Sequence, residues 1–540
     1  MGNLGLILLS STREVACRCG YPVIRAPMSH AEIYDEPSFS PAEITSIMFG
    51  LMLAMFLASL DQTIVATSLS TMARDLNGWE LMPWVVSAYL VTSTTTTPIY
   101  GRLSDLYGRR PILLIAISLF VGASVLCALA QSMPQLIAAR LLQGIGGGGL
   151  RSVSQAIVAD VVPPRERGRY QGYFTTTFAV SSTLGPVLGG FFADYLSWHW
   201  IFWINLPLGA LALTLTNRNL KRLRVPSQRA VIDWLGALLI LASATPLLIG
   251  VGRVEQAGGW ASLGVVLPIV IGLLSIVALV MRERIAPEPM LPLRLFFNRT
   301  FSFASLASFL TAMVMIGLII LVPIDYELVG GLSANQAGMR LIPITGGTAL
   351  GSFIAGQLIS RTGRYRIFPV SGACSMTVLC AALAYLGLGH ALWVDLAATL
   401  ILGMSFGFQM SPMSVTVQNA LDRRDTGVGM SVMMFCRLMG GAFGVALLSS
   451  VLVSGLNTGA LAVPGHEVLG PNPGIALFHL DERGTQLTPA LRHAFAGSIE
   501  RAFTRLFIVA SMIGALSIVS SLGLKEIPLR GREPKKPALA

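Results

Sequence analysis

The chain has 540 residues, of which 53% are hydrophobic and only 12% are charged. Its mean hydropathy of +0.68 is too high for an ordinary soluble protein, so most of the chain is expected to lie in lipid. The net charge of +11 does not indicate nucleic-acid binding, because the basic residues form short clusters between apolar runs instead of one basic face.

The N-terminal segment, residues 1–43, is expected to be a cytoplasmic tail. It contains no signal peptide with a small-residue cleavage site, and its apolar stretch from Leu4 to Leu9 is too short to span a bilayer. Met28 offers a second start position, so we hypothesise that the first 27 residues precede the true start codon.

Fourteen stretches of the sequence are candidates for membrane-spanning helices. A bilayer core about 30 Å thick requires about 20 residues of helix, and the stretches match that length. In chain order they are 44–65, 82–100, 111–130, 135–159, 170–192, 200–215, 232–251, 263–281, 301–323, 337–359, 367–387, 392–413, 428–453 and 502–524. Their length and continuity favour helices over a β-barrel and predict an all-α integral membrane fold.

Arginine and lysine are concentrated in alternate loops between these stretches. The basic loops fall at 102–110, 165–169, 218–229, 282–299, 361–366 and 423–424, whereas the intervening loops hold only scattered basic residues. Since basic loops face the cytoplasm, both termini are predicted to be cytoplasmic. The basic residues are nearly all arginine, a bias typical of GC-rich bacterial genomes, so a bacterial cytoplasmic membrane is the expected location.

One short pattern occurs twice in equivalent positions. GRLSDLYGRR, residues 101–110, follows the second stretch, and GQLISRTGRYR, residues 356–366, follows the tenth. With the two central stretches set aside, each copy takes the same place in a six-helix half, and transporters built of repeats bind substrate between the repeats. The predicted domains are an N-terminal half (44–217), a two-helix insertion with basic linkers (218–300), a C-terminal half (301–524) that contains a long external loop (454–501), and a basic cytoplasmic tail (525–540).

The first copy of this pattern is a candidate conformational latch. Its residues are Gly101, Asp105, Gly108, Arg109 and Arg110. The two glycines allow a tight turn, and Asp105 can accept hydrogen bonds from backbone or arginine donors nearby. The loop resembles the signature loop of the major facilitator superfamily, which joins two helices on the cytoplasmic side. That superfamily usually has a basic residue where Leu106 stands, so part of the latch is expected to be missing.

Two charged residues within the stretches are candidates for proton coupling. Asp61 lies in LDQTIVATSL, residues 60–69, which resembles the first-helix motif of the fourteen-helix drug:proton antiporters of this superfamily. Arg140 begins RLLQGIGGGG, residues 140–149, which is similar to the fourth-helix motif of proton-coupled members. Because the two helices run antiparallel, these side chains are expected at similar depth. We predict that Asp61 alternates between pairing with Arg140 and binding a proton; the alternative is that Asp61 only caps or packs.

The sequence SSTLGPVLGG, residues 181–190, predicts a bend in the fifth helix. Pro186 removes a backbone donor, and glycines at 185, 189 and 190 remove side chains, so the helix can bend and pack closely there. The residues concerned are Gly185, Pro186, Gly189 and Gly190. The motif is similar to the one that distinguishes antiporters from symporters in the superfamily, although Ser181 stands where glycine is usual. The resemblance favours export over uptake.

Four further charged residues are candidates for a substrate site or a second proton site. Asp325 and Glu327 lie near the outer end of the ninth stretch, and the alternative for both is a solvated helix end. Arg151 and Arg437 are cations inside stretches, where an unpaired charge is costly. Arg437 matches the family's eleventh-helix pattern, and its alternative role is a tie between helices. For Arg151, which stands where the family commonly has an apolar residue, the alternative is a side chain that reaches the cytoplasm.

The resemblance extends over nearly all of the chain from Asp61 to Leu524. SWHWIFWINLPLG (197–209), DWLGALL (233–239) and the segment 418–446 match the same fourteen-helix branch. The branch implies a major facilitator fold with two additional central helices, and proton-coupled export of hydrophobic or cationic drug-like compounds across the cytoplasmic membrane. No nucleotide, metal or other cofactor is expected, since no phosphate loop and no metal-ligand spacing occur. The protein is expected to be a monomer and not an enzyme.

Two other functions remain open. The same fold could export an endogenous metabolite, a lipid or a siderophore, because a fold does not fix its substrate. A polytopic membrane transferase is the remote alternative; it would require histidines or acidic residues clustered near an interface, and the six histidines of this chain are scattered.

Overall fold

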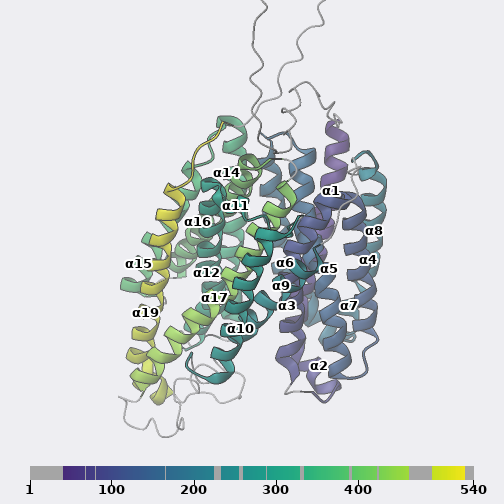
Figure 1. The fold of residues 1–540 in the computed structure, drawn as a ribbon. Coiled ribbons are helices and arrows are strands. Elements are labelled where there is room, and N and C mark those ends of the chain that lie inside the picture. The colour runs from purple at the N-terminus through teal and green to yellow at the C-terminus, as the bar shows by residue number, and fades with distance from the viewer. Residues whose placement is uncertain are drawn as a thin grey trace, which may run out of the picture. The chain divides into compact units, whose positions relative to one another are not determined.

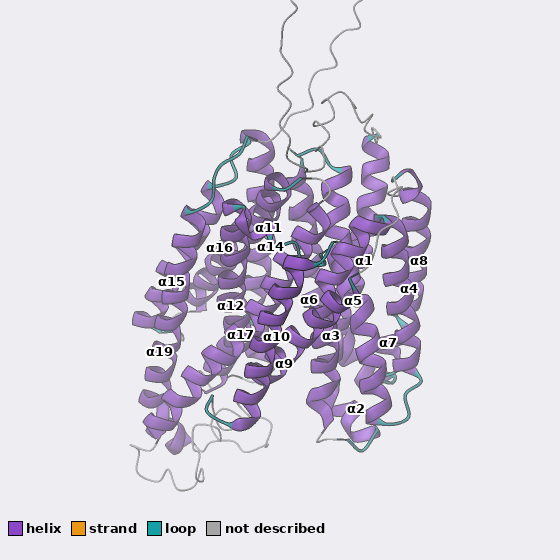
Figure 2. Cartoon of the chain, in the orientation of Figure 1, coloured by secondary structure: helices purple, strands orange, loops and turns teal. Residues whose placement is uncertain are grey.

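The computed structural model describes residues 40–66, 68–78, 81–164, 166–223, 233–254, 260–287, 289–328, 332, 334–387, 392–422, 425–460 and 489–528. Within these ranges every regular element is a helix and no strand occurs, which agrees with the predicted all-α fold (Figure 2). Most of the predicted N-terminal tail, the middle of the predicted external loop and the end of the basic tail lie outside the described residues.

Helices α1 to α8 form one group with its own apolar core. Its elements are α1 (Pro41–Ala66), α2 (Leu69–Asp75), α3 (Met82–Tyr107), α4 (Arg109–Ala128), α5 (Met133–Val161), α6 (Arg167–Tyr195), α7 (Trp200–Trp203), α8 (Asn205–Asn219) and the 3-10 turn η2 (Leu220–Arg222). Glycines bring α5 close to its neighbours: a Cβ atom on Gly144 would lie 2.5 Å from the carbonyl oxygen of Tyr89 in α3. Small residues permit such close packing of helices in lipid.

Helices α11 to α19 form a second group with separate apolar cores. Its elements are α11 (Arg294–Phe297), α12 (Arg299–Leu328), α13 (Ala334–Met339), α14 (Ile342–Thr362), α15 (Ile367–Leu386), α16 (Leu392–Ala420), α17 (Thr426–Ala460) and α19 (Pro489–Leu522). Gly347 and Gly351 of α14 face Gly403 and Gly407 of α16. The two glycines of each helix are four residues apart and so lie on one face of that helix. Without side chains on these faces, the two backbones can approach each other closely.

Two central helices, α9 (Trp234–Gly252) and α10 (Leu263–Ile285), pack against each other, and α9 also contacts α3 and α17. Asp233 caps α9 by accepting from the Gly236 amide at 3.1 Å, and it forms an ion pair of 3.0 Å with Arg282 at the end of α10. Only 17% of the most apolar window of α10 is buried, so this helix presents an apolar surface suited to lipid.

Within the residues that the structure describes, eleven helices are long and apolar enough to cross a membrane. Of the fourteen stretches predicted from the sequence, the remaining three correspond to α3, α5 and α6, which are 26, 29 and 29 residues long. These three helices have the length of a span, about 39 Å or more at 1.5 Å per residue. The mean hydropathy of their most apolar window is lower than that of the other eleven helices. They carry the serines and threonines of 93–97 and of 175–182 and the arginines of α5.

Several helices extend beyond their predicted ends. The helix α12 continues through Leu328, whereas the prediction ended it at residue 323. The helices α17 and α19 enter the predicted loop at 454–501 from both sides, since α17 ends at Ala460 and α19 begins at Pro489. Apolarity marks only the lipid-embedded part of a helix, so polar extensions beyond it escape a hydropathy criterion.

The beginning of α1 and the end of α19 lie at the same end of the helix bundle, which we call the terminal end (Figure 1). Contacts between the two helix groups are found near it. The Ser411 hydroxyl of α16 donates to the Gly168 carbonyl of α6 at 3.4 Å, and Gln418 donates to the Gln155 carbonyl of α5 at 3.3 Å. The backbones of Gly168 and Gly356 also meet directly there.

Candidate functional site

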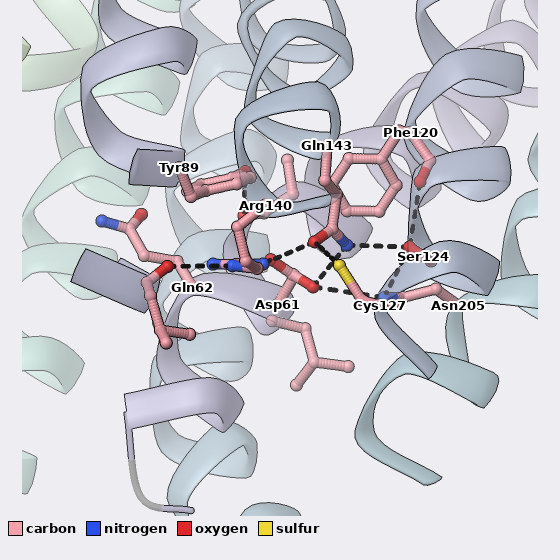
Figure 3. A network of polar contacts seen from close by, with 12 residues as sticks. Asp61, Gln62, Tyr89, Phe120, Ser124, Cys127, Arg140, Gln143 and Asn205 are labelled. Carbon is pink, nitrogen blue, oxygen red and sulfur yellow. Dashed lines mark hydrogen bonds and ion pairs between the residues drawn. The ribbon is translucent and has the colours of Figure 1, made fainter. Parts of the chain in front are cut away.

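Asp61 of α1 and Arg140 of α5 form a buried ion pair (Figure 3). The Arg140 Nη1 atom lies 2.5 Å from the Asp61 Oδ2 atom, and each residue is only 1% exposed. The sequence predicted this proximity from the antiparallel course of the two helices. Burial of both charges away from water makes the pair sensitive to any change in the charge of either member.

Three neutral side chains complete the polar surroundings of Asp61. Gln143 donates to the Asp61 Oδ1 atom at 2.8 Å and to the Ser124 hydroxyl at 2.8 Å (Figure 3). Asn205, at the start of α8, donates to the same carboxylate oxygen and to the same hydroxyl, each at 3.2 Å. Both Asp61 oxygens therefore accept hydrogen bonds, and all three neutral residues are fully buried. No prediction from the sequence had placed Gln143, Asn205 or Ser124 in the site.

Arg140 has partners besides the carboxylate. Its Nη1 atom donates to the Gln143 Oε1 atom at 2.6 Å and its Nε atom to the Val85 carbonyl at 3.2 Å. The guanidinium carbon lies 4.3 Å from the centroid of the Tyr89 ring and 6.0 Å from that of Phe202. Aromatic faces and neutral acceptors can hold the guanidinium in place if the carboxylate loses its charge.

The local sequence of α5 explains how this site is assembled. Arg140 and Gln143 are three residues apart, so both project from the same face of the helix. The glycine run that follows lets α3 approach: a Cβ atom on Gly147 would lie 2.5 Å from the Tyr89 hydroxyl. The motif noted in the sequence therefore supplies both the charged group and the space for the ring that covers it.

Arg151 lies nearby but binds only neutral groups among the described residues. Its Nη2 atom donates to the Gln62 side chain at 2.7 Å and to the Ala58 carbonyl at 3.2 Å, both in α1. The side chain is buried and is held by α1. This burial argues against a side chain that extends out of the helix bundle, and a role of Arg151 in transport stays a prediction.

The candidate latch connects the two helix groups at the terminal end. The Asp105 carboxylate accepts from the backbone amides of Gly427 at 3.2 Å and Val428 at 2.7 Å, which begin α17. Arg109 forms an ion pair with Asp105 and a second one of 2.8 Å with Asp160 at the end of α5. A carboxylate at a helix N-terminus satisfies free amides and interacts favourably with the helix dipole.

Of the other latch residues, Gly108 lies as expected, whereas Gly101 and Arg110 do not. Gly108 adopts a φ of 94°, which agrees with the predicted turn. Gly101 does not lie in that turn but within α3, where a Cβ atom would lie 2.7 Å from the Gly427 carbonyl oxygen of α17. Arg110 is directed to α8, where it donates to the Asn217 side chain at 2.6 Å. Gly101 therefore serves close packing between the groups, and Arg110 stays within one group.

The fifth-helix motif lies against the part of α1 that carries Asp61. A Cβ atom on Gly185 would collide with the Thr63 side chain and lie 3.1 Å from the Ile64 amide nitrogen. The Gly189 carbonyl accepts from Ser68 at 3.0 Å, whereas Gly190 has open space around it. The side chain of Pro186 lies outside the described residues. Gly185 thus packs α6 against the end of α1, and Gly189 binds Ser68 at the start of α2.

The remaining candidates do not belong to one site. Asp325 is 4% exposed, so the alternative of a solvated helix end is wrong for it, and the side chain of Glu327 lies outside the described residues. Next to Asp325, Arg340 lies 5.1 Å from the Tyr326 ring centroid and 3.7 Å from Asp395. Arg437 lies in another part of the C-terminal group.

Arg437 of α17 is half-buried and donates to the Met410 carbonyl of α16 at 3.4 Å. No acidic side chain pairs with it among the residues that the structure describes. The proposed tie between helices thus consists of one long hydrogen bond from Arg437 to α16. The four candidates for a second site are distributed over both helix groups.

Comparisons of the sequence and of the structure with known proteins all find transporters of one superfamily. Residues 51–445 match the model of the Major Facilitator Superfamily. An uncharacterized MFS-type transporter of Mycobacterium tuberculosis is 33% identical over 501 residues, which cover 91% of this chain and 71% of that protein. The multidrug transporter protein MdtP of Bacillus subtilis is 34% identical over 410 residues, which cover 76% of this chain and 75% of that protein. The crystal structure of the human organic anion transporter MFSD10 superposes with a TM-score of 0.61 at 16% identity, over 89% of this chain and 100% of that chain.

Proposed function

The chain belongs to the Major Facilitator Superfamily, and on that premise we propose that it is a proton-coupled antiporter that exports hydrophobic drug-like compounds. The observation that carries the proposal is the buried Asp61–Arg140 pair, whose carboxylate also accepts from the neutral amides of Gln143 and Asn205. The family membership and the relatives named as multidrug transporters support efflux as the direction of transport. The resemblance also implies cationic compounds as substrates.

We further propose that the chain is a fourteen-helix member of this superfamily. The helices α3, α5 and α6 have the length of a span, and their polar residues belong to the proton site or to contacts between helices. They would join the eleven apolar helices as transmembrane segments. The halves would then be 44–217 and 301–524 with an insertion at 218–300, and the terminal end would face the cytoplasm of a bacterium.

In the proposed cycle, a proton that binds Asp61 weakens its ion pair with Arg140. Gln143 and Asn205 keep the carboxyl group in position, and Gln143 together with the Tyr89 ring retains the guanidinium. Since α6 contacts α1 beside Asp61 through Gly185, a shift at the pair would reach the contacts of α6 with the C-terminal group. Proton entry would supply about 2.3 kcal/mol per charge at 100 mV, in addition to the pH gradient.

The test is uncoupler-sensitive efflux of ethidium and of neutral N-phenyl-1-naphthylamine from cells that contain the protein. We expect Asp61→Asn to abolish the response of efflux to a pH gradient while substrate exchange without a gradient persists. The matched control is Asp75→Asn, since that carboxylate is 50% exposed and its pairing with Arg74 at 3.9 Å is weak.

Three results decide the proposal. Efflux by Asp61→Asn that still follows the pH gradient would remove Asp61 from the coupling role. Efflux by the unsubstituted protein that ignores the uncoupler would contradict antiport. No efflux of either probe would favour an endogenous metabolite, lipid or siderophore as the substrate.

A further inference from the structure

Two arginines in the interior of the helix bundle lack an acidic partner among the described residues. Arg140 pairs with Asp61, Arg109 with Asp105 and Asp160, and Arg340 with Asp395. In contrast, Arg151 binds the Gln62 side chain and a carbonyl, and Arg437 binds one carbonyl at 3.4 Å. Each therefore contributes an uncompensated positive charge.

The two arginines lie at similar depth in the bundle. Arg151 precedes the end of α5 at Val161 by ten residues, about 15 Å at 1.5 Å per residue. Arg437 follows the start of α17 at Thr426 by eleven residues, about 16 Å. Those two helix ends lie together, because Arg109 joins Asp160 to Asp105 and Asp105 binds the start of α17. In a bilayer core about 30 Å thick, both residues are near the midplane.

The two arginines also come from opposite helix groups that touch. The helices α5 and α17 contact each other directly. The Met410 carbonyl, which accepts from Arg437, belongs to α16 of the same group, so Arg437 lies between α17 and α16. In transporters made of two repeats, substrates bind near the midplane at this boundary.

We propose that Arg437, assisted by Arg151, binds the acidic group of an amphipathic organic anion such as a carboxylate or sulfonate. The proposal rests on the proposed export function and names its substrate class. A guanidinium away from water gains most from a planar or multi-oxygen anion, because several donors can bind it at once. Arg437 is half-buried and so retains surface for such a contact, whereas Arg151 is already held by α1 and contributes mainly its charge.

A purely structural role for Arg437 predicts something different. One hydrogen bond of 3.4 Å to a backbone carbonyl would tie α17 to α16 weakly, and a neutral donor of similar length would replace it. A cationic substrate fits these charges poorly, because no carboxylate of the described residues pairs with either arginine. The sign of the charge that the site prefers is therefore the property to measure.

The test compares two ligands of the same ring system and nearly the same size, one anionic and one neutral. Binding of 2-naphthalenesulfonate and of neutral 2-naphthalenesulfonamide to the purified full-length protein in phosphatidylcholine nanodiscs is followed by calorimetry. We expect the protein to bind the sulfonate about tenfold more tightly, and Arg437→Gln to abolish this preference by weakening sulfonate binding alone. Arg437→Lys should retain part of the preference, and Arg151→Gln should reduce it. The control is Arg253→Gln, an exposed arginine beside the Trp84 ring.

Several outcomes would overturn the proposal. These are equal binding of the two ligands, absent sulfonate binding, or variants that weaken both ligands equally and thus act on the fold. Loss of the preference when phosphatidylglycerol is added would assign the arginines to an anionic lipid headgroup instead. The binding assay does not depend on transport, so the two proposals can fail separately. Uncoupler-insensitive efflux would contradict the antiporter but not the preference for the sulfonate. Uncoupler-sensitive efflux without a preference for the sulfonate would contradict only the anion site.

Discussion

At the scale of single residues, both oxygens of the Asp61 carboxylate have hydrogen-bond donors in this structure. One carboxylate oxygen accepts from Arg140, and the other accepts from Gln143 and Asn205. A proton on this group must therefore displace one donor. If Arg140 is released, it keeps the Gln143 and Val85 oxygens and the Tyr89 ring as partners. The neutral amides would hold the carboxyl group in either state.

Gln143→Leu should show how much the neutral amides contribute. The substitution removes one donor from Asp61 and one from Ser124 in a fully buried place. We expect a loss of about 1–3 kcal/mol in the free energy of unfolding, measured by denaturation in detergent, because buried polar atoms remain unsatisfied. Uncoupler-sensitive efflux should also fall. Gln135→Leu, at an exposed position of the same helix, is the control; equal stability of the two variants would contradict the prediction.

The contact of Asp61 with Arg140 could be inferred from the sequence, while its surroundings could not. Two opposite charges at matching depth in antiparallel spans are rare enough in lipid to point to each other. Gln143 lies three residues from Arg140, so helical spacing was an available signal for it. Asn205 comes from α8, and a neutral amide gives no charge pattern that would associate it with α1. The burial of Asp325 was likewise invisible, because it depends on how α12 packs.

At the scale of elements, the fifth-helix motif contains glycines in two different environments. Gly185 faces α1 at Thr63 and Ile64, whereas Gly190 has open space. Gly185→Ala should force α1 and α6 apart next to Asp61, and overpacking of this kind costs about 1–3 kcal/mol. We expect lower stability in detergent and slower efflux for this variant.

Gly190→Ala is the matched control within the same motif. Its added methyl group meets no other atom, and alanine favours the helix by about 1 kcal/mol over glycine. Unchanged or slightly raised stability with normal efflux is the expected result. If Gly190→Ala impairs efflux as strongly as Gly185→Ala, the motif acts through bending of α6 and not through its contact with α1.

The fold was largely predictable at this scale because lipid constrains helices strongly. Apolar length located the long helices, whose ends shifted as for α12 and α17. The short helices α2 and α11 were not predicted, and the stretch 200–215 is divided into α7 and α8. The position of Gly101 was not predictable, since a glycine near a loop serves equally well in a turn or against another helix. Its neighbour Ser431 lies 330 residues later in the chain, and sequence alone does not place that contact.

At the scale of the whole bundle, several contacts between the two helix groups near the terminal end involve backbone atoms of one group. Asp105 binds the start of α17, Arg167 donates to the Gln418 carbonyl at 3.3 Å, and Gly168 meets Gly356. Such contacts contain few interdigitated side chains that would have to separate. A closure of this kind can form and open at low cost, as alternating access requires.

The meeting of Gly168 and Gly356 is the most sensitive of these contacts. A Cβ atom on Gly356 would collide with the Gly168 carbonyl oxygen and lie 3.2 Å from the Arg169 amide nitrogen. Backbone atoms cannot rotate away as a side chain would, so Gly356→Val should keep the terminal end open. The thiol of a Ser411→Cys substitution reports this state, because Ser411 lies between the groups. Its alkylation by a water-soluble maleimide, resolved by peptide mass spectrometry, should rise about tenfold, which corresponds to about 1.4 kcal/mol in the closing equilibrium.

Gly346→Val in the same helix separates this effect from a general one. Gly346 is exposed and its added side chain meets no atom, so alkylation at position 411 should stay at the level of the unsubstituted protein. Raised alkylation in both variants would mean that valine disturbs α14 itself. Unchanged alkylation in Gly356→Val would mean that closure does not depend on the approach of the two backbones, and the latch at Asp105 would then be the contact that holds this end shut.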